Sequence, residues 1–329
     1  MKKNIALLAG GDSGEYEISI KSAEGIKSQI DKTKYDVYSI HVKHNEWEYY
    51  SQDGMKVPVN KDDFTIRLGN KKITFDLVFI AIHGTPGEDG KMQGYFEMIG
   101  IPVTTCNSFT SSLTFNKYFC NNVVRSLGVR CATSMVSHYE RPLDNDIIAD
   151  KIGFPCFVKP NKGGSSVGIT KVKSKEELPA AFKRGFFEDD EMLVEQFIKG
   201  REITCGVFRD NGKIRVLPLT EIVSKNDFFD FEAKYNPALA EEIVPAPLKL
   251  NIEIEIRQLS TFLYNELNCR GIVRFDYIVD ADVIWFLEVN TVPGMTNESI
   301  VPKMVRELGI SLTSFYSMLI EESLRKFHV

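Results

Sequence analysis

Two carboxylates, an amide and an arginine lie close together near the carboxyl end of the chain, in the stretch GIVRFDYIVDADVIWFLEVN from 271 to 290. They are Arg274, Asp276, Glu288 and Asn290. As metal ligands, Asp, Glu and Asn side chains offer oxygen, which hard cations such as magnesium prefer. Two carboxylates about 4 Å apart at an effective dielectric near 20 repel by roughly 4 kcal/mol, so we expect a cation between them.

The same stretch predicts a β-hairpin. Every odd position from 273 to 289 is apolar or aromatic, which indicates one buried strand face and places the four polar residues on the other face. A turn centred on Ala281 would set Arg274 opposite Glu288, although other registers remain open. The alternative is a surface hairpin with ordinary salt bridges, but this hairpin is too apolar for both faces to be solvated.

Two glycine-rich loops follow apolar runs in the first hundred residues, where short strands and helical patterns alternate. This alternation predicts a parallel α/β sheet, whose ligands lie beyond the carboxyl ends of the strands. One loop, at 10–15, ends in Glu15, and the other, at 83–90, begins with His83. The alternatives are a simple strand-to-helix turn, a glutamate that serves the helix dipole, and a histidine that is a hydrogen-bonded structural group.

A third loop, at 161–168, contains Gly-Gly-Ser-Ser and joins the predicted strands 156–159 and 169–172. Its backbone N–H groups can cover phosphates, with Lys159 beneath it as a point charge. The Walker pattern GxxxxGK[ST] is absent, and the loop lies between strands instead of ahead of a helix. A mobile hairpin without a ligand is the alternative.

Residues 192–198 predict an edge-like strand, followed by antiparallel strands at 201–208 and 213–217. Such an edge could pair its backbone with an adenine ring, with Glu195 and Glu202 directed at the base or the ribose. Taken alone, these two glutamates are interpreted as surface charges.

Two further stretches carry candidate binding groups. The loop at 228–235 is dense in aromatic residues between charges and includes Lys234, which predicts either a lid or a surface that packs on a neighbouring domain. Ser299 lies at the entry of a predicted helix at 300–308, whose free N–H groups would favour a carboxylate.

The whole chain excludes several classes of protein. It has 329 residues and a net charge of -5, so it can bury a large core and shows no basic footprint for nucleic acid. Its six cysteines form no CxxC pair, which suits reduced, buried thiols. No apolar run approaches the eighteen or so residues that span a bilayer, and the opening apolar run 5–9 predicts a β-strand instead of a signal peptide. We expect a soluble, cytoplasmic protein.

Taken together, six blocks resemble the D-alanine:D-alanine ligases of the ATP-grasp superfamily. In order along the chain they are GGDSGEYEIS, HGTPGEDGKMQG, FVKPNKGGSSVG, FFDFEAKY, RFDYIV and LEVNTVPGMTNES. The resemblance covers residues 5 to about 308 and implies an α/β and α+β chain: an N-terminal parallel α/β domain followed by an ATP-grasp fold. The implied ranges are 1–108 for the N-terminal substrate-binding domain, 109–191 for the central subdomain, and 192–329 for the C-terminal subdomain with the metal site.

The resemblance implies that ATP phosphorylates the carboxylate of one D-alanine and that the amine of a second attacks the acyl phosphate, giving D-alanyl-D-alanine for peptidoglycan precursors. It also implies two Mg²⁺ ions, for which Mn²⁺ can substitute, and a homodimer. The residues implied for phosphates are Lys117, Lys159 and Lys234, those for the base and ribose are Glu195, Phe197, Ile198 and Glu202, and those for the metals are Asp276, Glu288 and Asn290. Arg274 and the N–H of Gly294 would form the oxyanion site.

For the amino acids, the resemblance implies that Glu15 binds the first ammonium group, with His83 beside that substrate. Ser299 and the N–H of Ile300 would take the carboxylate of the second D-alanine. A hydrogen-bonded trio of Glu15, Ser165 and Tyr235 would close the lid, and the tyrosine favours a dipeptide over the ester D-alanyl-D-lactate.

Three positions depart from the family pattern. Phe229 and Phe231 stand where many relatives carry tyrosine, which puts any polar lid contact there in doubt, and Asn116 stands where an aspartate is usual. None of them touches the predicted metal set, so we expect activity.

Two rival functions fit the same fold. A catalytically silent nucleotide-binding regulator would lack a metal ligand or the oxyanion arginine, and all four residues are present. A ligase for another carboxylate, such as an L-amino acid, is disfavoured by Glu15, His83, Ser299 and the lid block.

Overall fold

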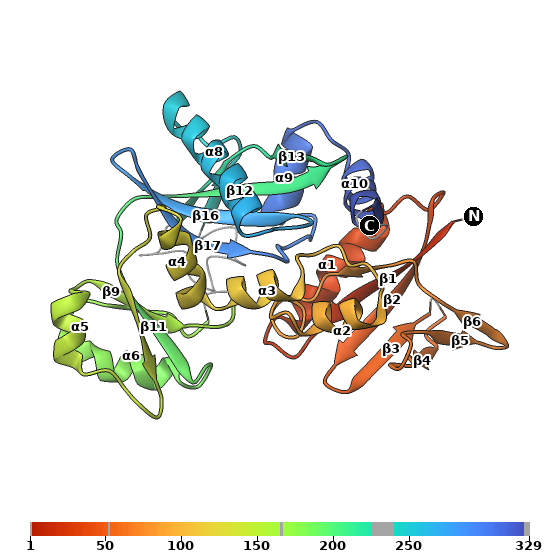
Figure 1. The fold of residues 1–329 in the computed structure, drawn as a ribbon, viewed down its shortest axis with the longest axis horizontal. Helices are drawn as coiled ribbons and strands as arrows, with labels where there is room; N and C mark the ends of the chain where they lie inside the picture. The colour runs from red at the N-terminus through yellow and green to blue at the C-terminus, as the bar shows by residue number, and fades with distance from the viewer. Residues whose placement is uncertain (1, 52, 165–166, 225–239, 326–329) are drawn as a thin grey trace.

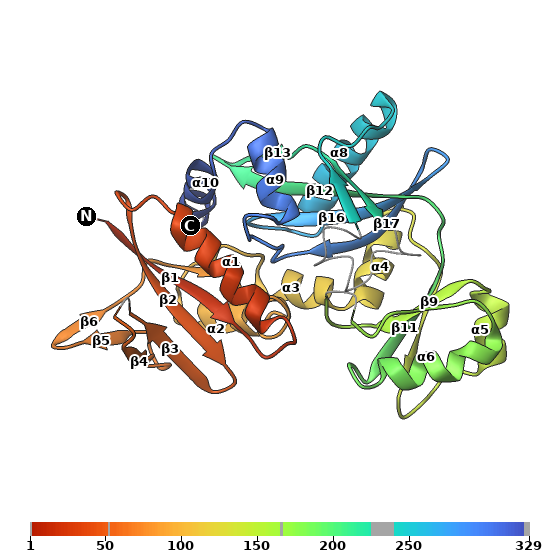
Figure 2. The ribbon, with the colours of Figure 1, turned by 180° about the vertical axis from the view of Figure 1, so that it is seen from behind.

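The computed structural model describes residues 2–51, 53–164, 167–224 and 240–325. Its elements form an N-terminal, a central and a C-terminal group, with the N-terminal and central groups at opposite ends of the molecule (Figure 1, and from behind in Figure 2). In these ranges, no helix is long and apolar enough to cross a membrane. The six cysteines are buried and unpaired, as expected.

The N-terminal group is a five-stranded sheet flanked by helices. Its elements are β1 (Lys3–Gly10), α1 (Tyr16–Gln29), β2 (Tyr35–Lys43), β3 (Glu46–Tyr50), β4 (Lys56–Pro58), β5 (Ile66–Leu68), β6 (Lys71–Ile73), β7 (Leu77–Ile80) and α2 (Lys91–Ile99). The strand order is β4-β3-β2-β1-β7, and β1 runs parallel to both neighbours, as predicted. The antiparallel strands β3 and β4 and the separate β5–β6 hairpin were not predicted.

Helix α1 packs closely because its buried face is made of small residues. Ser19, Ser22, Ala23 and Ile26 are buried and recur at the spacing of one helix face. The face therefore brings Ser22, from the second turn, into the interior beside the sheet.

The central group is a four-stranded antiparallel sheet, β10-β9-β11-β8, with its own buried cluster. Its elements, together with the connecting helices, are α3 (Ser108–Phe115), α4 (Lys117–Ser126), β8 (Ser134–His138), α5 (Asn145–Lys151), β9 (Cys156–Pro160), β10 (Thr170–Val172), the 3-10 helix η1 (Lys175–Glu177), α6 (Leu178–Gly185) and β11 (Glu191–Gln196). The strand predicted at 192–198 forms as β11, but its predicted edge-like position is wrong, because β11 pairs with β9 on one side and β8 on the other.

The C-terminal group is a six-stranded sheet covered by helices. Its elements are β12 (Arg201–Asp210), β13 (Lys213–Val216), β14 (Thr220–Ser224), β15 (Ala240–Ile243), α8 (Leu250–Glu266), β16 (Val273–Asp280), β17 (Val283–Asn290), α9 (Ile300–Glu307) and α10 (Leu312–Arg325). Strand β12 lies between β14 and β16, and β16 pairs with β17.

The β16–β17 hairpin forms as predicted, but its register differs. Asp276 lies opposite Glu288, and Arg274 opposite Asn290. The predicted pairing of Arg274 with Glu288 is wrong for two reasons. The two-residue turn is centred between Ala281 and Asp282, which shifts the register by one residue, and a β-bulge after Asp276, with Leu287 as the extra residue, shifts it by one more. The turn consists of Ala281 and Asp282, with positive φ angles of 42° and 74°, as in a tight two-residue hairpin.

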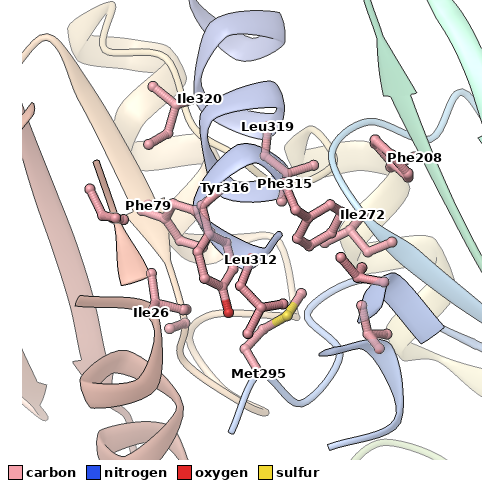
Figure 3. Close-up of a cluster of buried hydrophobic side chains, with 14 of the residues drawn as sticks. Ile26, Phe79, Phe208, Ile272, Met295, Leu312, Phe315, Tyr316, Leu319 and Ile320 are labelled. Atoms are coloured by element: carbon pink, nitrogen blue, oxygen red, sulfur yellow. The ribbon is translucent and has the colours of Figure 1, made fainter. Parts of the chain in front are cut away.

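One buried cluster joins the N-terminal and C-terminal groups. Helix α10 lies between them, with Tyr316 against Phe79 of β7 and Phe315 against Phe208 of β12, at ring-centroid distances of 6.0 and 5.1 Å (Figure 3). Met295, which follows β17, belongs to the same cluster. The two groups therefore share a core.

The ranges 1–108, 109–191 and 192–329 stay a prediction of the domain organisation. Because β11 pairs on both sides with strands of the central sheet, we propose that the second boundary lies after Gln196.

Candidate active site

A cleft of about 880 Å³ opens where the three groups of elements meet. This volume suits a small ligand such as a nucleotide. The predicted site residues on its walls are Glu15, Lys117, Lys159, Glu195, Phe197, Ile198, Glu202 and Glu288. Residues predicted from widely separated blocks of sequence therefore face one cavity.

The first glycine-rich loop requires glycine at two positions. Gly10 and Gly11 have φ angles of 95° and 105°, and a Cβ on them would lie 2.4 Å from Val42 O and 2.6 Å from a methyl group of Ile82. The loop is then tied to the second glycine-rich loop, because Ser13 Oγ donates to the carbonyl of His83 at 2.9 Å. Both loops lie at the carboxyl edge of the parallel strands, as predicted.

Glu15 follows this loop and directs its carboxylate at the third glycine-rich loop, 161–168, which we call the flap. A Cβ on Gly164 would lie 3.0 Å from Glu15 Oε2, so glycine there permits the close approach. Glu15 occupies the N-cap position of α1 without a side-chain capping bond. Glu15 therefore does not cap the helix with its side chain, although its charge still lies at the N-terminus of α1, where it suits the helix dipole.

Lys159 and Glu195 form an ion pair inside the cleft. Lys159 Nζ lies 2.7 Å from Glu195 Oε2, and the side chains are 8% and 4% exposed. Asn121 Nδ2 donates to the other oxygen of Glu195 at 3.1 Å. Burial alone would lower the pKa of Lys159, but the charges of Glu195 and Glu288 outweigh it and raise the pKa. Lys159 is thus a permanent cation, and Glu195 is not a surface charge.

Lys117 lies at the start of α4 and holds the flap. Its Nζ donates to the carbonyl of Gly163 at 2.5 Å, and its backbone N–H donates to Asn161 O at 3.1 Å. The preceding Asn116 caps the helix by accepting from Phe119 N at 3.0 Å. An asparagine caps a helix as well as an aspartate does, so this departure from the family pattern leaves the position of the lysine unchanged.

Aromatic and apolar side chains line another part of the cleft. Phe197 lies edge-on to Phe157 at 5.8 Å, and Lys171 Nζ lies 4.0 Å from the centre of the Phe197 ring. Trp285 and Leu287 also line the cleft, although the sequence pattern placed them on the buried face of the hairpin. The bulge explains the difference, since it shifts the alternation of β17 by one residue.

Asp276 is the centre of a buried polar cluster on the hairpin. Arg274 donates to its two oxygens at 2.8 Å each, and Asn290 Nδ2 donates at 2.9 Å. Thr204 of β12, which lies directly opposite in the sheet, donates at 2.5 Å. Burial lowers the pKa of Arg274, but the negative charge of Asp276 outweighs burial and raises the pKa, so the guanidinium stays protonated.

The donor set of this cluster fits a hard cation. Asp276 is 2% exposed and lies opposite Glu288, and Asn290 adds an amide oxygen. The charges of Glu288 and Glu202 both act on Arg274 and Lys159, so the acidic residues and the two cations share one electrostatic region. Sequence reasoning missed Thr204, although it shares a strand face with Glu202.

The remaining predicted residues lie on the turn that follows β17. Gly294 packs on Ser299, since a Cβ on the glycine would lie 2.9 Å from Ser299 Oγ. Ser299 Oγ accepts from Thr296 N at 3.1 Å and makes no capping bond to α9, which begins at Ile300. The N–H groups at the start of α9 therefore have no cap from this side chain.

Like Arg274 and Ser299, His83 is not among the residues on the wall of the cleft, and its place beside a substrate stays a prediction. It is 5% exposed and lies on the wall of a second cavity of about 10 Å³. Ser165, Lys234 and Tyr235, with Phe229 and Phe231, lie outside the residues that the structure describes.

Glu88, from the second glycine-rich loop, is a partly buried acid that was not singled out from the sequence. It accepts from Gly84 N at 2.7 Å and from Val292 N at 3.2 Å, and so joins the N-terminal group to the segment after β17. Burial, and then the negative charge of Glu15, raise the pKa of Glu88 from its usual 4.5 to about 7.

This pKa predicts a pH dependence of stability. Between about pH 4.5 and 7 the folded state retains a proton on Glu88 that the unfolded chain loses, so this group lowers stability as pH rises through that window. The variant Glu88→Gln lacks the effect, and its melting temperature relative to the wild type should rise from pH 5 to pH 8. Thermal unfolding at both pH values tests this, with Glu298→Gln, whose side chain is 87% exposed, as the control. If the melting temperatures of Glu88→Gln and the wild type differed by the same amount at pH 5 and pH 8, this prediction would be contradicted.

Comparison with known proteins gives one family. The families described as D-ala D-ala ligase N-terminus and D-ala D-ala ligase C-terminus match residues 4–106 and 99–321. The chain is 43% identical over 322 residues to the D-alanine–D-alanine ligase of Bacteroides fragilis, covering 98% of this chain and 99% of that protein.

Two solved structures extend the comparison. VanG D-Ala:D-Ser ligase from Enterococcus faecalis is 32% identical with a TM-score of 0.85, covering 98% of this chain and 99% of that one. The D-alanine–D-alanine ligase from Bacillus anthracis complexed with ATP is 28% identical with a TM-score of 0.78, covering 99% and 98%. The chain therefore has the ATP-grasp fold and belongs to the D-alanine–D-alanine ligase family.

Proposed function

We propose that the chain joins two D-alanine molecules into D-alanyl-D-alanine, with cleavage of ATP to ADP and phosphate, for peptidoglycan precursors. The observation that carries the proposal is a nucleotide-sized cleft in which the buried cation Lys159 lies near Glu288 of an oxygen-rich cluster. Phosphoryl transfer depends on such neutralisation of charge more than on covalent help from the protein.

We propose that different residues bind the base, the ribose, the phosphates and the metal ions. Phe197 and Ile198 hold the base, with Glu195 and Glu202 at the base and ribose, while Lys117 and Lys159 bind phosphates and position the flap loop over them. Asp276, Glu288 and Asn290 would hold two Mg²⁺ ions. Magnesium bound there would neutralise the charge on the phosphoryl group that is transferred.

In the second half of the reaction, the amine of the second D-alanine attacks the acyl phosphate and phosphate leaves. We propose that Arg274 and the N–H of Gly294 stabilise the negative charge that develops on the carbonyl oxygen. Glu15 would bind the ammonium group of the first D-alanine. Ser299 and the N–H of Ile300 would bind the carboxylate of the second, at the uncapped start of α9.

Turnover with defined substrates tests the function. We expect magnesium-dependent release of ADP with D-alanine alone and, by mass spectrometry, one D-alanyl-D-alanine for each ADP. D-serine and D-lactate, added with D-alanine, test the second position, because a solved relative is a D-Ala:D-Ser ligase. Turnover with L-alanine but not D-alanine would show that the substrate assignment is wrong.

Nucleotide binding without turnover would favour the silent regulator. Trp285 lines the cleft, and the other tryptophan, Trp47, packs on Tyr95 in the N-terminal group. In a Trp47→Phe variant, the fluorescence of Trp285 should therefore change on addition of ATP, which separates binding from catalysis. The cytoplasmic location and the homodimer remain proposals that rest on the family resemblance.

A further inference from the structure

His83 is hydrogen-bonded through both ring nitrogens. Nδ1 lies 2.9 Å from the carbonyl oxygen of Val292, and Nε2 lies 3.0 Å from Ser22 Oγ. A carbonyl only accepts, so we assign the proton to Nδ1, and Nε2 then accepts from the serine hydroxyl. Burial lowers the pKa of His83, although the charge of Glu15 acts in the opposite direction, so the ring is neutral.

Ser22 continues the chain of hydrogen bonds. Its hydroxyl oxygen accepts from Met295 N at 3.4 Å, and the residue is fully buried on the sheet-facing side of α1. The bonds therefore run from Met295 N–H to Ser22, from Ser22 to His83, and from His83 to Val292 O. Both ends of the chain lie on one short segment of backbone.

That segment contains Gly294. Val292 and Met295 flank it, and Glu88 accepts from Val292 N at 3.2 Å, so the N-terminal group holds the segment at three points. Met295 is also anchored by packing, since it lies in the buried cluster with Ile26 and Leu312 (Figure 3). The position of the Gly294 N–H thus depends on groups that lie outside the cleft.

We propose that His83 and Ser22 are positioning residues that fix residues 292–295, and with them the Gly294 N–H, against the N-terminal group. The inference rests on the proposed function, in which the Gly294 N–H stabilises the oxyanion.

The two half-reactions separate this role from substrate binding. Transfer of the phosphoryl group to the first D-alanine does not use the oxyanion site, whereas attack by the second amine does. A misplaced Gly294 N–H should slow only the second half-reaction, because a shift of about 1 Å in a catalytic group can cost on the order of 100-fold. A histidine that bound the first D-alanine would instead affect the first half-reaction and its KM.

The experiment compares Ser22→Ala with Ser28→Ala, a matched change on the same helix. Ser28 Oγ donates only to Gly25 O and is exposed. With ATP labelled with ¹⁸O in the β,γ bridge, exchange of the label into the β-phosphate reports reversible formation of the acyl phosphate. Release of dipeptide reports the complete reaction.

We expect Ser22→Ala to lower kcat about 10-fold or more, to keep the KM for the first D-alanine within about twofold, and to raise the ratio of exchange to turnover. Ser28→Ala should match the wild type. The amide of His83→Asn can replace Nδ1 as the donor to Val292 O. The kcat of His83→Asn should therefore fall less than the kcat of His83→Phe. Hydrogen exchange at residues 291–296 should become faster in Ser22→Ala.

Three results would overturn the inference. The first is an unchanged ratio of exchange to turnover in Ser22→Ala. The second is a loss of exchange and turnover by the same factor, in proportion to the loss of folded protein. The third is a change mainly in the KM for the first D-alanine, which rises. In each case an active wild type leaves the proposed function intact. If the wild type shows no ADP release that depends on D-alanine, the proposed function fails, and this inference fails with it.

Discussion

Replacement of Glu288 by glutamine is expected to remove nearly all turnover. Glu288 lies opposite Asp276 on the hairpin, and its charge acts on both Lys159 and Arg274. In the proposed function it would help to hold Mg²⁺, and a neutral amide would not supply the negative charge that balances the cation. We expect kcat to fall by much more than tenfold in the ADP-release assay at saturating ATP and D-alanine.

The matched control is Glu298→Gln, which makes the same chemical change on a side chain that is 87% exposed. It should keep the wild-type rate. In Glu288→Gln on the Trp47→Phe background, the fluorescence of Trp285 should still change on addition of ATP. Such a change would show that the variant keeps a cleft that binds nucleotide although it has lost activity. If the variant kept more than about a tenth of the wild-type rate, a barrier change of roughly 1.4 kcal/mol or less, the metal role would be contradicted.

Replacement of Arg274 by methionine should impair both catalysis and stability. The guanidinium makes two hydrogen bonds of 2.8 Å to Asp276, which is 2% exposed. Loss of an oxyanion donor typically costs about 100- to 1,000-fold in kcat. Removal of one partner of a buried ion pair costs about 3–5 kcal/mol of stability, because the other charge stays buried.

A double variant separates the two effects. In Arg274→Met/Asp276→Asn the buried charge is gone, so the free energy of unfolding should partly recover while activity stays lost. Arg257→Met is the control. Arg257 makes an ion pair with Glu253 at 2.9 Å, whose side chains are 33% and 35% exposed, and long hydrogen bonds of 3.3–3.4 Å to the carbonyls of Val216 and Leu217, so its loss should cost clearly less than the loss of Arg274. Chemical denaturation and ADP release measure both quantities. An active single variant would exclude Arg274 from the oxyanion site.

The strongly periodic parts of the fold could be predicted from the sequence. The parallel pairing of β1, the flap between β9 and β10, the antiparallel strands after β11, and α8 all occur where pattern indicated them. The short strands β4, β5 and β6 could not be predicted, because each has three residues and no apolar run. They are set by pairing with a neighbour rather than by their own composition.

For the β16–β17 hairpin, the residue types could be predicted to form a site, but the pairing of the residues could not be predicted. The residue types at 274, 276, 288 and 290 were sufficient to predict an oxygen-rich site. The partner of Arg274 was not predictable, because the two-residue turn and the extra residue at Leu287 each shift the register by one, and nothing in the local composition marks the bulge. The same shift turns Trp285 from the core toward the cleft.

Burial of polar groups was the second point that the sequence left open. Glu195 could be read as a surface charge until its partners, Lys159 and Asn121, were known from distant parts of the chain. His83 was placed beside a substrate by resemblance alone, and its partners come from α1 and from the segment after β17. Such partners are brought together only by the tertiary fold.

The shared core around α10 has a mechanical consequence. The N-terminal and C-terminal groups are joined through one buried cluster, so they should behave as a single rigid body. The central sheet has its own cluster and is the part free to rotate as a unit. Phe197 and Ile198 immediately follow β11, on the link to β12 of the C-terminal sheet, whereas residues 161–164 follow β9 within the central group. A rotation of the central sheet would therefore carry residues 161–164 with it.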